Sequence, residues 1–235
     1  MIDTILFDLD GTLLLSDGDE FTKAYFAALG TYMMPLHEPE DLIKAVWAGT
    51  KAMVLNDGTR TNEDAYWDTY CDIYGEDARK EEPIFAEFYR TRYAELNTMC
   101  GSIPGMDTLI RDLKSSGYKL VVATNPLFPI FVQEMRIRWA GIDPECFDRI
   151  TSYENSHFSK PNPAYYSEIL EQIGSGAENT LMVGNDVRED MESAAKAGIR
   201  GFLMTDYLLN RDGKDISAYP QGKFEDLSRF IETLK

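Results

Sequence analysis

Two patterns of apolar and polar residues divide the chain. Residues 4–7 form a short apolar run, typical of a strand buried on both faces, and acidic residues follow it. Residues 16–100 instead repeat apolar side chains every three or four positions, the spacing of amphipathic helices, with almost no strand pattern. From Gly101 onward, helical patterns alternate with apolar runs. This alternation predicts a parallel sheet covered by helices on both faces.

The helical segment is therefore interpreted as an insertion between the first strand and the rest of the sheet. We expect an α/β core of residues 1–15 and 101–235, and an all-helical domain of residues 16–100, with hinges near 15–17 and 98–103. Helices are predicted in the insertion near residues 21–32, 41–54, 62–74 and 84–96. In the core, strands are predicted at residues 119–125, 149–153, 180–183 and 199–204, and helices near 109–113, 127–140, 163–173, 188–197 and 224–234.

Composition and charge exclude several kinds of partner. The 235 residues carry a formal net charge of -17, which argues against a nucleic-acid or anionic-membrane surface. The amino terminus lacks the basic and apolar regions of a secretory leader, and no apolar run could span a bilayer, so we expect a cytoplasmic protein. Three well-separated cysteines predict neither a disulfide framework nor a zinc site. The sequence also lacks Gly-rich dinucleotide and Walker-type phosphate loops.

Polar clusters follow the predicted strands at their carboxyl ends, where ligands bind in open parallel sheets. Asp8 and Asp10 come directly after the first strand; alone, they also fit an ordinary acidic turn or a calcium loop. Thr124 and Asn125 end the second strand of the core and offer a hydroxyl and an amide. An ordinary helix N-cap would use the same residues.

Two further clusters add a cation and more oxygen ligands. Lys160 lies in a proline-rich loop before a predicted helix, where a lone lysine is usually only solvated. Segment 184–190 contains Asn185, Asp186 and Asp190, which also suit the acidic first turn of a helix. Together the four clusters offer a nucleophilic carboxylate, phosphate donors, a cation and metal ligands. This combination predicts a phosphoryl-transfer site with Mg²⁺ as its metal.

The clusters, in this order and spacing, resemble the motifs of the haloacid dehalogenase superfamily of hydrolases, and the resemblance covers the whole chain. Segment 7–13, Phe-Asp-Leu-Asp-Gly-Thr-Leu, is similar to the first family motif and is highly specific. Thr124 and Asn125 are similar to the second motif, Lys160 to the third and segment 184–190 to the fourth. The resemblance implies a Rossmann-like core. Because the insertion lies between the first two motifs, it also implies a helical cap of the family's first type.

The resemblance also implies a role for each matching residue. Asp8 would attack phosphorus and form an aspartyl-phosphate. Asp10 would protonate the leaving alcohol and later deprotonate the attacking water. Thr124 and Asn125 would bind the phosphoryl oxygens, and Lys160 would compensate charge between the nucleophile and the phosphate.

The fourth motif departs from the common family pattern, which has Gly-Asp where this chain has Gly-Asn at 184–185. By the resemblance, Mg²⁺ would be bound by Asp8, by the main-chain carbonyl of Asp10, and by either Asn185 or Asp186. These two are equal alternatives at this point. An amide ligand would predict weaker binding of the metal because it lacks the charge of a carboxylate.

Within the family, an acid two residues after the nucleophile favours phosphate-ester hydrolysis over dehalogenation. We expect a magnesium-dependent phosphatase that acts on a small phosphorylated metabolite, as a monomer or homodimer. A hexose-phosphate phosphomutase of the same superfamily shares both aspartates. A non-catalytic binding or regulatory domain is a further alternative, and Asn185 is its main support. Asp190 is expected to support the site by pairing with Lys160 or a bound water.

The insertion supplies candidates for its own core and for substrate recognition. Its aromatic residues, with Trp47 and Trp67 among them, recur at helical spacing and are interpreted as core. Lys44, Trp47, Lys51 and Arg60 lie in the region that could face the sheet domain. A cation there would favour a substrate with a second anionic group.

Overall fold

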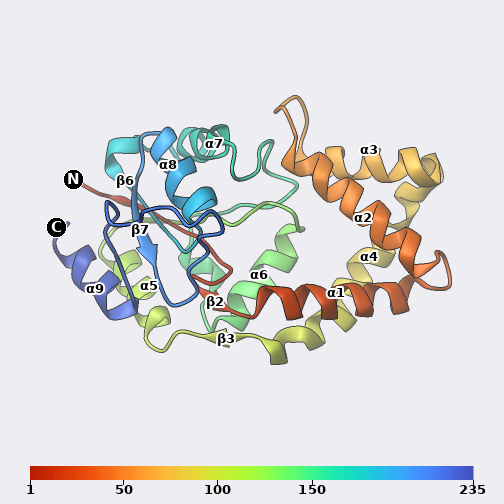
Figure 1. The fold of residues 1–235 in the computed structure, drawn as a ribbon, viewed down its shortest axis with the longest axis horizontal. Coiled ribbons are helices and arrows are strands. Elements are labelled where there is room, and N and C mark those ends of the chain that lie inside the picture. Colours follow the sequence, from red (N-terminus) through yellow and green to blue (C-terminus); the bar gives the residue numbers. More distant parts are fainter. Residues whose placement is uncertain (235) are drawn as a thin grey trace.

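The computed structural model describes residues 1–234, and in this part of the chain one six-stranded sheet forms the core (Figure 1). All its neighbouring strands are parallel, in the order β5-β4-β1-β6-β7-β8. Its strands are β1 (Thr4–Phe7), β4 (Lys119–Val122), β5 (Arg149–Ile150), β6 (Thr180–Gly184), β7 (Arg200–Met204) and β8 (Gln221–Gly222). The chain builds one side of the sheet outward from β1 and then the other. In such sheets ligands bind at the carboxyl ends of the strands where this direction changes, here between β1 and β6.

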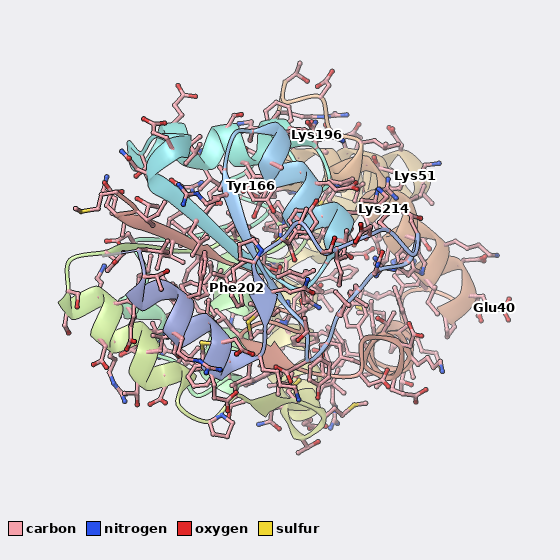
Figure 2. All side chains as sticks on the ribbon, turned by 60° about the vertical axis from the view of Figure 1, so that its left-hand side comes forward. Glu40, Lys51, Tyr166, Lys196, Phe202 and Lys214 are labelled. Atoms are coloured by element: carbon pink, nitrogen blue, oxygen red, sulfur yellow. The ribbon has the colours of Figure 1, made fainter. Side chains whose placement is uncertain are left out.

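Helices cover both faces of the sheet, as the alternating pattern predicts. One face packs against α5 (Met106–Ser115), α6 (Ile130–Trp139) and α9 (Phe224–Glu232), and the other against α7 (Pro163–Ile173), α8 (Ser193–Lys196) and the π-helical turn η6 (Val187–Glu192). Ile5 and Phe7 of β1 contribute to the first layer and Leu6 to the second, because successive strand residues point to opposite faces. Figure 2 labels one residue of each layer. Phe202 of β7 belongs to the layer that contains α9, and Tyr166 of α7 belongs to the other layer.

Between β2 (Leu14–Leu15) and β3 (Gly101–Ser102), the described chain forms helices and no strands. These are α1 (Gly18–Met33), α2 (Pro39–Val54), α3 (Asn62–Tyr74), the 3₁₀ helix η1 (Glu76–Glu81), α4 (Glu82–Phe88), the π-helical turn η2 (Tyr89–Tyr93) and the 3₁₀ helix η3 (Ala94–Met99). They form a group beside the sheet in Figure 1 and share a separate, largely aromatic hydrophobic core. β2 pairs with β3 in antiparallel register, so the chain enters and leaves the helical insertion at one place.

The predicted bounds agree with the structure for some elements and differ for others. β1 and α7 have the predicted bounds, whereas the strand predicted at 149–153 is reduced to Arg149–Ile150. The two-residue strands β2, β3 and β8 and the 3₁₀ turns η4 (Pro144–Cys146) and η5 (Ala177–Asn179) were not predicted, because segments this short have no periodicity of their own. Within residues 1–234, no helix is both long and apolar enough to cross a membrane.

One prediction about the helical insertion is wrong. Trp67 is buried in its core, but Trp47 is 51% exposed, because its side chain lines a cavity beside the packed helices. A role of Lys44, Lys51 and Arg60 in substrate recognition stays a prediction. Lys44 pairs with Asp41 and Arg60 pairs with Asp68 on the surface, and Lys51 is exposed on α2 (Figure 2).

Asp148 links three elements at the start of β5. Its Oδ1 accepts a hydrogen bond from Lys114 Nζ at 2.6 Å, and its Oδ2 accepts one from the Leu120 N–H at 2.9 Å. Partial burial alone would raise the pKa of this carboxyl. The two donors outweigh burial and hold the pKa below its ordinary value of 3.8.

We expect Asp148→Asn to lower the free energy of unfolding by about 1 kcal/mol at neutral pH, a small effect because solvent screens this half-exposed pair. Since the folded-state pKa is lowered, the stabilisation is present above pH 3.8 and is lost as the pH falls through the folded-state value. Urea unfolding should give equal differences from wild type at about pH 7 and about pH 5, and a smaller one near pH 3. Asp112→Asn, at an exposed position on α5, is the control. An undiminished difference near pH 3 would contradict this assignment.

Candidate active site

The carboxyl ends of the central strands bring the predicted site residues together. The Asp8 N–H donates to Val183 O at 2.9 Å, and the Ala123 N–H donates to Phe7 O at 2.7 Å. The next residues after these strands are therefore neighbours at one edge of the sheet. They include Asp8 after β1 and the segment beginning at Asn185 after β6. This edge is the switch point at which a parallel sheet of this order binds ligands.

Lys160 lies at the centre of the site, between two carboxylates. Its side chain is 1% exposed, and its Nζ donates to Asp8 Oδ1 at 2.8 Å and to Asp190 Oδ1 at 2.6 Å. Burial would lower the pKa of the ammonium, but the charges of Asp190 and Asp8 hold it well above its ordinary value. Lys160 is therefore a permanently charged group that joins the loop before α7 to β1 and η6.

Asp8 is buried as well, with only one oxygen of its carboxylate engaged. Its Oδ2 accepts no hydrogen bond from the described residues, whereas Oδ1 is bound by Lys160. Burial raises the pKa of Asp8 to about 8, with Lys160 opposing this shift and Asp190 adding to it. Lys160 alone therefore does not offset the cost of burying this carboxylate. A second cation beside the free oxygen would favour the ionised form.

Asp190 connects Lys160 to the start of the fourth motif. Its Oδ2 accepts hydrogen bonds from the Asn185 N–H at 3.0 Å and the Asp186 N–H at 2.9 Å. Gly184 makes room for this contact, since a Cβ there would lie 2.3 Å from Asp190 Oδ2. The carboxylate is thus satisfied on both oxygens, and it has no oxygen left for a metal.

The side chain of Asn185 lies against the loop that carries the two aspartates. Its Oδ1 accepts from Thr12 Oγ1 at 3.2 Å, and its Nδ2 donates to Tyr207 O at 2.7 Å. Gly11 has φ 81°, and a Cβ on it would lie 2.3 Å from Asn185 Nδ2. Glycine at position 11 therefore allows both the turn after Asp10 and the close approach of this amide.

Asp186 is engaged in local structure instead. Its Oδ1 accepts from the Arg188 and Glu189 N–H groups at 2.8 and 2.9 Å, which caps the first turn of η6. Its Oδ2 pairs with Arg211 Nη1 at 2.7 Å. Both oxygens therefore have protein partners, whereas the amide oxygen of Asn185 has one long hydrogen bond.

Thr124 and Asn125 follow β4 and are held mainly through their backbone. Thr124 O accepts from the hydroxyls of Thr151 and Tyr165, each at 2.7 Å. The amide of Asn125 is less well satisfied. Its Nδ2 lies 3.4 Å from Glu189 Oε2, and its Oδ1 is buried without a hydrogen-bond partner among the described residues. A buried amide in this state has capacity for a further polar partner.

Arg136 is a site residue that the sequence analysis missed. It is buried on α6, its Nη2 forms an ion pair with Asp10 Oδ1, and its Nη1 donates to Gln133 Oε1 at 3.2 Å. Its guanidinium carbon lies 5.5 Å from the centre of the Phe128 ring. The sequence did offer a signal, because Arg136 lies four residues after Val132 and directly before Ile137, which are both buried on α6. A basic residue in a helix is usually exposed, however, so this signal was not used.

A cavity of about 830 Å³ opens beside these groups and is lined by Asp10, Arg136 and Asn185. The described residues contain no group of three or more His, Cys, Asp or Glu side chains arranged to bind a metal ion. The predicted magnesium site does not need three such side chains. Its ligands would be the carboxylate of Asp8, the main-chain carbonyl of Asp10, and the side chain of either Asn185 or Asp186. The free oxygen of Asp8 and the weakly engaged oxygen of Asn185 fit a hard cation of this type.

Comparison with known proteins identifies the family. The model of the haloacid dehalogenase-like hydrolases matches residues 2–198. The chain belongs to this family of hydrolases. The match spans the sheet strands β1 to β6 and the whole helical insertion, so it covers all four clusters of the site.

Relatives within the family are phosphatases. The glyceraldehyde 3-phosphate phosphatase of Methanothermobacter thermautotrophicus is 28% identical over 242 residues, which cover 100% of both chains. The phosphoglycolate phosphatase of Aquifex aeolicus is 26% identical over 200 residues, 85% of this chain and 83% of the relative. Among solved structures, the magnesium-bound HAD-hydrolase YfnB of Bacillus subtilis has the same fold, with TM-score 0.58 and 24% identity over 98% of this chain and 99% of that chain.

Removal of Lys160 should strongly destabilise the fold, because Asp8 and Asp190 would remain buried without their cation. We expect Lys160→Met to lower the free energy of unfolding by about 3–5 kcal/mol, measured by urea denaturation. Lys196→Met is the matched control, since Lys196 is exposed on α8 (Figure 2). Equal stability of the two variants would show that the buried pair does not hold these elements together.

Proposed function

We propose that the protein is a magnesium-dependent phosphatase that hydrolyses a small phosphate monoester through an aspartyl-phosphate on Asp8. The observation that carries this proposal is the buried contact of Lys160 with Asp8 at the switch point of the sheet, with Asp10 two residues further on. A buried carboxylate beside a fixed cation, two residues before an aspartate that lines a cavity, is suited to a nucleophile for an anionic substrate.

In the first step the carboxylate of Asp8 attacks phosphorus, and the bond between phosphorus and the ester oxygen breaks. The leaving alkoxide takes a proton from the carboxyl of Asp10. In the second step Asp10 removes a proton from water, the water oxygen attacks phosphorus, and the bond between Asp8 and phosphorus breaks. The products are the alcohol and inorganic phosphate, and both aspartates return to their starting states.

The position of Asp10 suits transfer of protons to and from the cavity. Its side chain is half-exposed and lines the cavity, whereas Asp8 is buried. Its ion pair with Arg136 fixes the carboxylate when no substrate is bound, and Asp10 takes up a proton from solvent when the substrate displaces this pair. Arg136 therefore acts as a positioning residue in this proposal, and Asp10 exchanges this partner for the leaving oxygen during the reaction.

Phosphate would be bound by the side chains of three residues, Lys160, Thr124 and Asn125. Lys160 Nζ, already 2.8 Å from Asp8 Oδ1, compensates charge as the nucleophile approaches the phosphoryl group. The hydroxyl of Thr124 and the amide of Asn125 would donate to phosphoryl oxygens. The Asn125 Nδ2 has only a long contact, 3.4 Å from Glu189 Oε2, so it has donor capacity for a phosphoryl oxygen.

For the metal we propose Asp8, the main-chain carbonyl of Asp10 and Asn185, in preference to Asp186. Asp186 would have to release the η6 cap or Arg211 to bind Mg²⁺, whereas Asn185 already lines the cavity beside Asp10. When bound, Mg²⁺ would offset the negative charge of the carboxylate and the phosphate. One carboxylate fewer than in a Gly-Asp motif predicts weaker metal affinity.

The proposal assigns residues 16–100 as a cap over a core formed by residues 1–15 and 101–235. The pairing of β2 with β3 supports this division, because both connections between the parts meet there. In such an arrangement the cap excludes water and contacts the leaving group. A cytoplasmic location and a monomeric or homodimeric state stay predictions from the sequence. The phosphomutase alternative is not favoured, since the relatives described above are phosphatases.

Asp8→Asn tests the mechanism. We expect it to lower phosphate release by more than about 1,000-fold, because an amide is not a nucleophile for phosphorus. Phosphoglycolate, pyrophosphate and glyceraldehyde 3-phosphate with Mg²⁺ form the assay panel, and chelation of the metal should also stop release. Asp3→Asn, at an exposed position just before β1, is the control. Wild-type rates from Asp8→Asn would rule out the proposed nucleophile.

A further inference from the structure

A second cavity lies between the helical insertion and the sheet domain. It measures about 490 Å³ and is bounded by helices α1 to α4, by η2, and by the loops at residues 127–131 and 153–154. Neither the sequence analysis nor the proposed reaction uses it. Its size is in the range of cavities that bind small organic ligands.

The walls of this cavity are mostly aromatic. Half of the residues that line it are Phe, Tyr or Trp, among them Tyr66, Tyr89, Phe128 and Phe131. Trp47 also lines it, and its ring lies 5.2 Å from that of Phe26. The side chain of Trp47 is half-exposed. Aromatic walls favour a ring-bearing ligand, because ring pairs gain free energy beyond the area that they bury.

Charged groups around this aromatic cavity disfavour an anion. Three carboxylates line it, those of Glu63, Glu82 and Glu154. Among the lining residues in the described chain, the only cation is Arg90, whose guanidinium carbon lies 4.8 Å from the centre of the Phe131 ring. Glu63 and Glu82 both pair with Arg79, so Glu154 supplies the remaining negative charge and no positive charge is in excess for an anionic leaving group.

The aromatic cavity is continuous with the proposed active site. Thr22, Tyr25 and Phe128 line both this cavity and the one beside Asp10. Along the chain, its wall at residues 127–131 begins two residues after Asn125, the proposed phosphate ligand. A group attached to a phosphate at the site can therefore extend into the aromatic cavity.

We propose that the aromatic cavity binds the alcohol part of the substrate, and that this part is an uncharged, ring-bearing group. This inference rests on the proposed phosphatase function and specifies its substrate class. It separates this protein from its relatives named for phosphoglycolate and glyceraldehyde 3-phosphate, whose organic parts are small and carry no aromatic ring.

The test compares kcat/KM for three esters of primary alcohols, with Mg²⁺ present: 2-naphthylmethyl phosphate, ethyl phosphate and phosphoglycolate. We expect kcat/KM for the naphthylmethyl ester to exceed that for both other esters by about 10-fold or more, because only this ester has a ring that can pack against the aromatic walls. Acetyl phosphate, whose leaving group is too small to fill the cavity, reports the phosphoryl-transfer chemistry itself.

Trp47→Ala tests the cavity directly. We expect it to lower the ratio of kcat/KM between the naphthylmethyl and ethyl esters by about 5-fold or more. Trp47 is half-exposed, so the variant should fold, which circular dichroism checks. Ile73→Ala is the matched control, because Ile73 is similarly exposed on α3 and does not line the cavity. It should leave the ratio unchanged.

Each outcome decides between the two claims. If acetyl phosphate is hydrolysed but the naphthylmethyl ester has no advantage, the inference is overturned and the proposed function stands. A ratio that Trp47→Ala leaves unchanged also overturns the inference. If no compound releases phosphate, the proposed function fails, and the inference fails with it.

Discussion

The ion pairs of Lys160 with Asp8 and Asp190 are the interaction on which the rest of the structure depends. Three segments far apart in the sequence meet at this ammonium: the end of β1, the loop before α7, and η6. Burying three charges is favourable only when each is paired, so the backbone around the site must hold these distances closely. The N–H groups of residues 185 and 186 do this for Asp190. The same arrangement that stabilises the fold thereby places a carboxylate, its cation and a free carboxylate oxygen at the switch point of the sheet.

The helical insertion is held together separately from these ion pairs. Its own aromatic core keeps α1 to α4 together, and the paired strands β2 and β3 join it to the sheet domain at one place, next to Asp10. The space left between the two parts is mainly aromatic, whereas the space beside Asp10 is lined largely by polar and charged side chains of both signs. In the proposed function, chemistry and recognition are carried by different parts of the chain. The sheet domain would supply the groups that act on the phosphate, and the insertion would supply surfaces that contact the organic part of a substrate.

The sequence predicted the fold well wherever a pattern was long enough to be read locally. β1 stood out as an apolar run, and α7 was predicted with its bounds at residues 163–173. Arg136 and the exposure of Trp47 could not be predicted, because both depend on which side of a helix meets another part of the chain. The choice between Asn185 and Asp186 was open for the same reason. The two residues differ in their contacts with Thr12, which bonds Asn185, and with Arg211, which pairs with Asp186, and both partners lie far from the fourth motif in sequence.

Direct detection of the phosphorylated residue tests the central claim most closely. An acyl phosphate can be trapped by quenching the enzyme during turnover and reducing it with borohydride, which converts the phosphorylated aspartate to homoserine. Peptide mass spectrometry then locates the modified position. The account predicts homoserine at position 8, in amounts that depend on Mg²⁺ and disappear in the absence of substrate. Homoserine at another aspartate, or none while phosphate is released, would contradict the assignment of Asp8 as the nucleophile.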